Sequence, residues 1–456
     1  MYWRILRSGS ALRPFALSVL ARLPISMAPL GMLLLVQQVQ GSYAVAGAVT
    51  GAFALGTAVG SPGLARVMDR AGQPLVIALS AVLSGALLAA LALSTVRGAG
   101  PVALVSVAAL AGVAFPPMSP AMRGAWKAVL PPGRLRQAGF ALDAVAVETV
   151  FVGGPLLLSL LLAPDMPVLP LLVTVGLLVV GGVGYSLTAA ARDAGLGVSD
   201  RTPAAHNTGH APTDRPAAAH DTRQAPTEPT AHAAPAEAVL RSRALLAVLA
   251  VAAAMAVAFG HIDTSLAATA RERLADPAAL GLLFTAIAGG SATGGLLYGA
   301  RHWRWLPGRQ LPVLLGAFAL ALAGLPLLLS ADELRLGALL PLLFVAGLPI
   351  APSLIVQQNL VDDRAHPSRA GEAQAWLSSA ATTGAAAGTA LCGVLLDVAG
   401  LPWAFAAAAI AAGCSAVIAA GTLLGRSRAG GRSRTSAAPN VASASAAPDT
   451  GGGSGR

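Results

Sequence analysis

Long apolar runs alternate along this chain with short polar segments that carry most of its charges. Each run has about 20 residues, the length that a helix needs to cross the hydrocarbon core of a bilayer, whereas barrel strands would give shorter segments of alternating polarity. A helix also satisfies its own backbone hydrogen bonds where lipid cannot. We therefore expect an all-α integral membrane protein with twelve transmembrane helices, over residues 14–37, 45–67, 75–93, 101–122, 139–162, 168–189, 244–270, 278–298, 311–329, 336–357, 371–396 and 402–424.

A polar segment between the sixth and seventh runs divides the chain into two similar parts. Residues 191–240 are rich in Ala, Pro, Thr and His and lack apolar periodicity, so this segment cannot bury a core of its own. The predicted organisation is a six-helix half over 1–190, a disordered cytoplasmic linker over 191–240, a second six-helix half over 241–425 and a disordered cytoplasmic tail over 426–456.

The basic residues are distributed unevenly between the two sides of the predicted spans. If the N-terminus is cytoplasmic, only four of the 30 Lys and Arg residues fall in outer loops, namely Arg97, Arg271, Arg273 and Arg335. Short loops rich in Lys and Arg stay on the cytoplasmic side of a membrane. We therefore expect a multi-pass protein of the cell (cytoplasmic) membrane with both termini in the cytoplasm.

Composition and motifs exclude several other classes of protein. A soluble domain with 55% hydrophobic and 11% charged residues would have too little polar surface. The net charge of +10 does not indicate nucleic-acid binding, because the basic residues lie at the ends of apolar runs and aromatic residues are scarce. The chain has no phosphate-binding loop, HExxH motif or nucleophile elbow, so we predict no enzyme activity and no cofactor. Neither the linker histidines nor the two cysteines have the spacing of a metal site.

Small residues four positions apart recur at equivalent places in the two halves. The second span contains GAVTG and GTAVG, and the eighth contains GSATG and GLLYG. This spacing lets helix backbones approach closely in a membrane. The recurrence predicts two pseudo-symmetric halves built from one six-helix unit, an architecture found among secondary transporters.

An ordered polar motif follows the second span, in SPGLARVMDRAGQP. Its Asp69, Arg70 and Gly72 resemble the D-R-x-G of the cytoplasmic loop signature of the major facilitator superfamily, although Ala65 and Gln73 differ from the usual residues. The resemblance covers almost the whole chain through the twelve spans, the central loop and the Gly-rich second and eighth helices. It implies the fold of that family, whereas the alternative interpretation of the motif alone is a polar turn with cytoplasmic arginines.

In that family the loop after the second helix helps to lock a cytoplasmic gate, and its acidic residue faces the start of the eleventh helix. The resemblance therefore implies a gate between the DRAG motif and Glu372, which lies at the start of the eleventh span in RAGEAQAW. A carboxylate there also suits the positive end of the helix dipole. Arg123, at the cytoplasmic end of the fourth span, is assigned to the same gate.

Few ionisable residues lie inside the predicted spans, where each costs about 2.5 to 3.5 kcal/mol at a helix centre and so marks a cavity or relay. Arg22 lies in the first span, and Asp143 and Glu148 lie in the fifth. A rise of about 1.5 Å per residue puts Arg22 and Glu148 at one depth and Asp143 nearer the cytoplasm. Glu148 is the first candidate to exchange a proton, because it shares the depth of Arg22, and Asp143 is the second, while Arg22 alternates between a carboxylate and substrate. The alternative is a permanent ion pair inside the first half.

Two further ionisable residues, His261 and Asp263, lie in AFGHIDTSL of the seventh span. The helical rise puts both towards the outer mouth. They either line the entrance to a central site or belong to a solvated helix end.

Proline residues occupy equivalent places in the fourth and tenth spans. They predict helices that break or bend around a central site, since proline lacks the N–H of a helical hydrogen bond. In the fifth span, VGGPLL resembles the core of the glycine-proline motif of family exporters, whereas the arginine that proton-coupled drug exporters carry within helix four is absent. The residues assigned to helix bends are Pro116, Pro117, Gly154, Pro155, Pro349 and Pro352.

These features predict a secondary active transporter that moves a small organic solute by alternating access, coupled to protons and directed outward. The expected partners are the solute, protons and the lipid bilayer, and the expected state is a monomer that binds no nucleic acid. One alternative is an uptake permease for a sugar or organic acid. Another is a membrane receptor or scaffold with the fold of a transporter and no transport activity.

Overall fold

The structure is a computed structural model that describes residues 9–131, 133–162, 166–196, 242–301, 303, 305–330, 336–365 and 370–424. Within these ranges the regular structure is helical, and twelve helical spans are long and apolar enough to cross a membrane. The predicted all-α fold with twelve spans is therefore confirmed. Most of the predicted linker and all of the predicted tail lie outside the described residues, so their disorder remains a prediction.

The first half contains six spans, the fourth of which is made of two helices. Its helices are α2 (Gly9–Gln40), α3 (Tyr43–Ala71), α4 (Gln73–Val96), α5 (Pro101–Val113), α6 (Met118–Val129), α7 (Arg134–Leu162), α8 (Leu169–Ser186) and α9 (Ala189–Leu196).

The second half repeats this order, and its tenth span is again made of two helices. Its elements are α10 (Arg243–Ala268), η2 (Thr269–Arg273), η3 (Pro277–Ala279), α11 (Leu280–Gly299), α12 (Pro307–Leu329), α13 (Leu336–Gly347), α14 (Ile350–Arg364), α15 (Ala370–Ala399), α16 (Leu401–Ala419) and η5 (Ala420–Leu424).

The predicted proline breaks occur in both halves. Pro116 and Pro117 lie between α5 and α6, where a proline both removes a helical donor and disfavours helical backbone at the preceding residue. Pro349 lies between α13 and α14, and Pro352 falls in the first turn of α14. Pro155, by contrast, lies inside the continuous helix α7, so it causes no break.

Glycines of the second and eighth spans pack directly against these breaks. A side chain on Gly60 would collide with the backbone of Val113, the last residue of α5, and a side chain on Gly294 would collide with the backbone of Leu348, just after α13. The predicted close approach of backbones thus positions a broken helix in each half.

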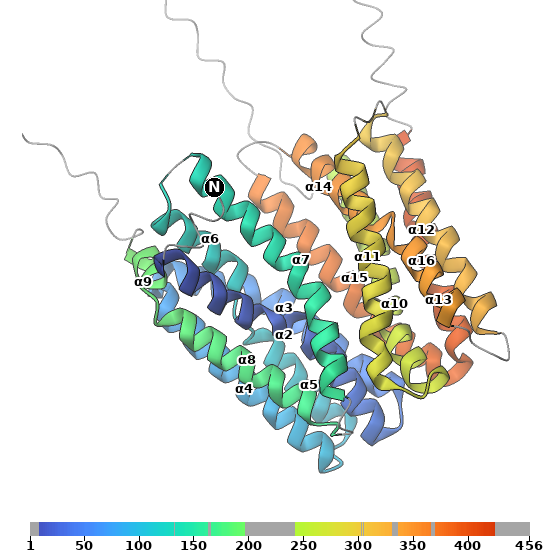
Figure 1. Cartoon of the computed structure of the whole chain (residues 1–456), viewed down its shortest axis with the longest axis horizontal. Helices are drawn as coiled ribbons and strands as arrows, with labels where there is room; N and C mark the ends of the chain where they lie inside the picture. The colour runs from blue at the N-terminus through green and yellow to red at the C-terminus, as the bar shows by residue number, and fades with distance from the viewer. Residues whose placement is uncertain are drawn as a thin grey trace, which may run out of the picture.

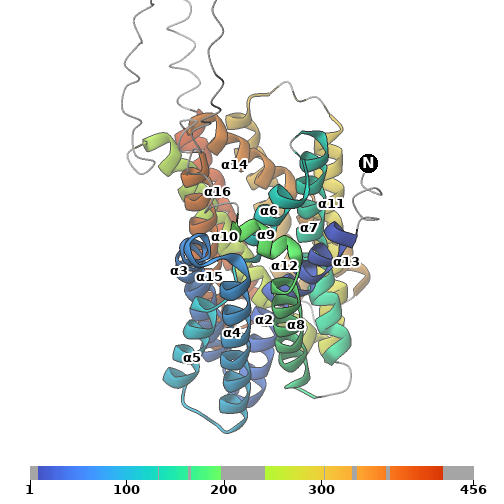
Figure 2. The ribbon, with the colours of Figure 1, turned by 90° about the vertical axis from the view of Figure 1, so that its left-hand side faces the viewer.

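The two halves meet towards one end of the bundle. Because each half has six spans, Gly9, Leu424 and both edges of the 197–241 gap lie at the same end of the bundle, which we call the linker end. The opposite end is the far end. Helix α3 packs on α15, α7 on α11, and α2 on α10, and Figure 2 shows α3 beside α15. The ribbons of α7 and α11 diverge towards the linker end (Figure 1). The close glycine contacts between the halves lie near the far end: Gly47 and Gly51 of α3 meet α15, and Gly281 of α11 meets α7.

Candidate functional site

Arg22 of α2 and Asp143 of α7 form an ion pair inside the first half. Arg22 Nη1 lies 2.7 Å from Asp143 Oδ1, and Nη2 lies 3.4 Å from Oδ2, so the guanidinium meets both carboxylate oxygens. Their side chains are only 5% and 10% exposed. Each charge thus offsets the cost of burying the other.

Asp143, the acidic partner of Arg22, is nearer the linker end along its helix than Arg22 is along α2. Helical side chains lean towards the helix N-terminus, and α2 begins at the linker end, so the guanidinium of Arg22 lies closer to that end than its own Cα does. Asp143 makes the contact with Arg22, although the helical rise puts Glu148 at the depth of Arg22. The side chain of Glu148 is outside the described part of the chain, so its role remains a prediction.

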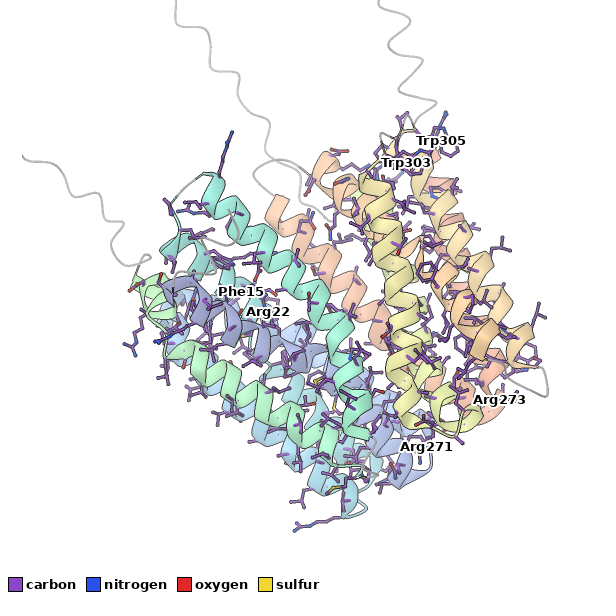
Figure 3. All side chains as sticks on the ribbon, viewed as in Figure 1. Phe15, Arg22, Arg271, Arg273, Trp303 and Trp305 are labelled. Carbon is purple, nitrogen blue, oxygen red and sulfur yellow. The ribbon has the colours of Figure 1, made fainter. Side chains whose placement is uncertain are left out.

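The same guanidinium reaches the break in the fourth span. Arg22 Nη2 donates a hydrogen bond of 3.3 Å to the carbonyl oxygen of Met118, the first residue of α6. Arg22 therefore joins α2, α6 and α7, and it lies within the first half, on the same helix as Phe15 (Figure 3). Its Nε is buried without a hydrogen-bond partner, so this site retains one unsatisfied donor.

Gly154 has a packing role beside this site. A side chain there would collide with Ser26 of α2, so the glycine permits the close approach of α7 to α2. Ser26 Oγ also donates to the carbonyl oxygen of Val150 at 3.0 Å. Gly154 thus acts through helix contact, whereas the sequence suggested a bend.

The break in the tenth span has neutral partners. Ser353 Oγ donates to the carbonyl oxygen of Pro349 at 2.7 Å, and Gln357 Nε2 donates to Met255 Sδ of α10 at 2.9 Å. Both polar side chains are buried. Gln357 therefore links the tenth span to the seventh, as Arg22 links the fourth to the first, but without a charge.

His261 and Asp263 of α10 have different surroundings. His261 is buried, with Nδ1 3.1 Å from the carbonyl oxygen of Val257, and its own carbonyl oxygen lies 3.5 Å from Cys392 Sγ of α15. Asp263, by contrast, is exposed. On the helical wheel it lies between the face of Gly260, which meets α15, and the face of Met255, which meets Gln357.

The predicted gate motif forms a tight joint between α3 and α4. Gly72 has φ +87°, which favours glycine, and its N–H donates to the carbonyl oxygen of Met68 at 3.0 Å. Arg70, Arg123 and Glu372 are exposed. The side chain of Asp69 lies outside the described part, so the gate remains a prediction.

Sequence reasoning missed two buried glutamines, each near the start of the third helix of its half, whose tyrosine partners lie on α8 and on α11. Gln73, at the start of α4, is buried and accepts a 3.2 Å hydrogen bond from the hydroxyl of Tyr185. Gln310, in the first turn of α12, is also buried and accepts a hydrogen bond from the hydroxyl of Tyr298. The available signal was a glutamine near the start of the third helix of each half.

Comparison with known proteins agrees with this geometry. The profile of the Major Facilitator Superfamily matches residues 15–379 and, in a second match, residues 275–448. A search of curated protein sequences finds no match.

Several solved structures share the fold. The nucleoside transporter NupG has a TM-score of 0.64 at 16% identity, covering 91% of this chain and 99% of that chain. The peptide transporter POT in complex with sulfate has a TM-score of 0.67 at 14% identity, with coverages of 94% and 98%. A bacterial homologue of the human lysosomal transporter Spinster has a TM-score of 0.58 at 15% identity, with coverages of 93% and 95%. With its family match over most of the chain and its two six-helix halves, this protein belongs to the Major Facilitator Superfamily.

Proposed function

We propose that this protein is a secondary active transporter that couples a small organic anion to protons by alternating access. The observation that carries the proposal is the buried pair of Arg22 and Asp143 at the break of the fourth span. Broken helices near ionisable side chains are typical of substrate and ion sites in transporters. Contacts between the halves in the far half of the bundle support a conformation that faces the linker end.

The chemistry of the pair explains how a proton and an anion would be linked. A proton that binds a carboxylate oxygen of Asp143 removes its charge and leaves the guanidinium of Arg22 without a counterion. An unpaired buried cation is costly, so an anionic group of the solute then replaces the carboxylate, and the unsatisfied Nε supplies an extra donor. Release of the anion and the proton restores the original pair.

This linkage favours proton and solute moving together, which under an inward proton gradient means uptake of an organic acid. The outward direction expected from the sequence needs proton and solute to compete for one group. Asp263 supports that second candidate, because its exposed carboxylate lies on the face of α10 between the contacts with α15 and with Gln357, where a proton and a cationic solute would compete for it. The linker end is proposed to be cytoplasmic, as the distribution of basic residues indicates.

The test is solute flux in proteoliposomes with and without a pH gradient, using labelled organic anions, nucleosides, dipeptides and organic cations. Gradient-driven accumulation of an anion, lost in Asp143→Asn while passive exchange continues, is the expected result. Antiport of a cation, lost in Asp263→Asn, would instead support outward transport. If no solute in the panel moves, a receptor or scaffold becomes the better account.

A further inference from the structure

A carboxylate of the second half caps a helix of the first half at the far end. Asp397, near the end of α15, accepts hydrogen bonds from the backbone N–H groups of Tyr43 and Ala44, at 2.9 Å each, through its two oxygens. Ser42 Oγ donates to the same carboxylate at 2.7 Å. Three bonds therefore join the two halves at the first turn of α3.

The start of α3 is well suited to bind this carboxylate. The first N–H groups of a helix have no partner within the helix, and they form the positive end of its dipole. The first turn of α3 contains no acidic residue of its own. Ser42 caps the helix locally by accepting from the N–H of Val45 at 3.2 Å, and its hydroxyl proton remains available for Asp397. Hydrogen bonds to a charged acceptor are stronger than neutral ones.

Close backbone packing surrounds this contact. A side chain on Gly393 of α15 would collide with the backbone of Tyr43, and one on Gly47 of α3 would collide with the backbone of Thr389. Tyr43 is buried, and the charged groups of Arg271 and Glu272 lie near its hydroxyl. Arg271 lies at the far end of the bundle (Figure 3). Opening of the far end must therefore break the contacts of Asp397 together with this packing.

We propose that Asp397 is an interhalf latch, which holds the far end closed and sets the balance between the two access states. In the state open at the far end, α3 and α15 separate, and water replaces the three bonds. Loss of the latch then favours that state. The inference rests on the alternating access of the proposed function.

Distances between spin labels across the far end test the latch. Val102 of α5 and Trp403 of α16 are exposed residues at the far ends of opposite halves, so labels on Val102→Cys and Trp403→Cys report opening, in a background with Cys392→Ala and Cys414→Ala. The variant Asp397→Asn keeps the shape of the side chain and removes its charge. In this variant the ratio of molecules with a long distance between the two labels to molecules with a short distance should rise about tenfold, because the closed state loses hydrogen bonds to a charged acceptor.

Two further variants make the outcome decisive. Ser42→Ala removes one of the three bonds and should shift the ratio in the same direction by a smaller factor. Asp362→Asn is the matched control, since Asp362 is also an exposed acid, but it accepts its bond from Gln374 within the second half. Unchanged distances in Asp397→Asn and Ser42→Ala, with both proteins folded, would overturn the latch. The distances report the access states whether or not a solute is moved, so a shift without transport would leave the latch standing and reject the proposed function.

Discussion

The two halves of this protein share a scaffold but differ in how they hold charge. In each half a glycine of the second helix packs on the break of the fourth. A glutamine near the start of the third helix accepts a hydrogen bond from a tyrosine hydroxyl in each half, of α8 in the first and of α11 in the second. In the first half the break is joined to the first helix by a buried ion pair. In the second half it is joined by the neutral side chain of Gln357, and the acid Asp263 is exposed.

This difference separates the helix packing that the two halves share from the charged groups that are particular to each half. The glycine contacts recur because both halves need the same close packing around a broken span. A buried glutamine also recurs near the start of the third helix, although its tyrosine partner comes from α8 in the first half and from α11 in the second. The charges do not recur, so the packing does not require them. We therefore expect substitutions in the shared scaffold to act equally in both halves, and substitutions of charge to act unequally.

The largest effect is expected from breaking the ion pair. Arg22→Ala leaves Asp143 as a buried carboxylate without its counterion, which should cost about 3 to 5 kcal/mol in the free energy of unfolding. The measurement is the thermal or denaturant unfolding of the purified protein in detergent. The double variant Arg22→Met with Asp143→Leu should recover most of that stability and still lack gradient-driven transport. Recovery of both stability and transport would mean that the pair is only structural.

A smaller and symmetric effect is expected at the glycines. Gly60→Val and Gly294→Val should each lower the free energy of unfolding by about 1 to 3 kcal/mol, because a side chain at either position forces the broken helix away. Gly63→Val and Gly299→Val are matched controls, since the space beside both glycines is open. Unequal losses at the two test positions would show that the halves are packed differently at their breaks.

The glutamines should show a weaker symmetric effect. Gln73→Ala and Gln310→Ala each leave a tyrosine hydroxyl without its acceptor, which should cost about 1 to 2 kcal/mol. Gln358→Ala, at an exposed position on α14, should cost much less. Unfolding midpoints of the three variants, measured side by side, check this order. Equal midpoints would show that the two buried glutamines contribute no more to stability than the exposed Gln358.

The smallest change in stability is expected at Asp263. Because this carboxylate is exposed, Asp263→Asn should change the free energy of unfolding by less than about 0.5 kcal/mol. Asp143→Asn, which disrupts the buried pair, should be clearly less stable in the same assay. A loss at Asp263 as large as that at Asp143 would contradict the proposed difference between the halves.

The sequence contains the elements of this architecture but only part of the site. Spans follow from the length of apolar runs, and the breaks follow from the local chemistry of Pro116, Pro117 and Pro349, so both were predictable. Which acid pairs with Arg22 depends on the direction of the side chains and on how α2 and α7 are shifted relative to each other. The helical rise per residue determines neither of these. The interhalf contact of Asp397 depends on how the halves dock, and it joins residues more than 350 positions apart.

Proton movement that accompanies solute entry tests the central claim most directly. Proteoliposomes that contain a pH-sensitive dye are exposed to a solute that the flux panel has identified, with no gradient imposed. The account predicts that the wild-type protein acidifies the interior as solute enters, and that Asp143→Asn exchanges solute without moving protons. Solute entry without acidification in the wild type, or undiminished acidification in Asp143→Asn, would contradict it.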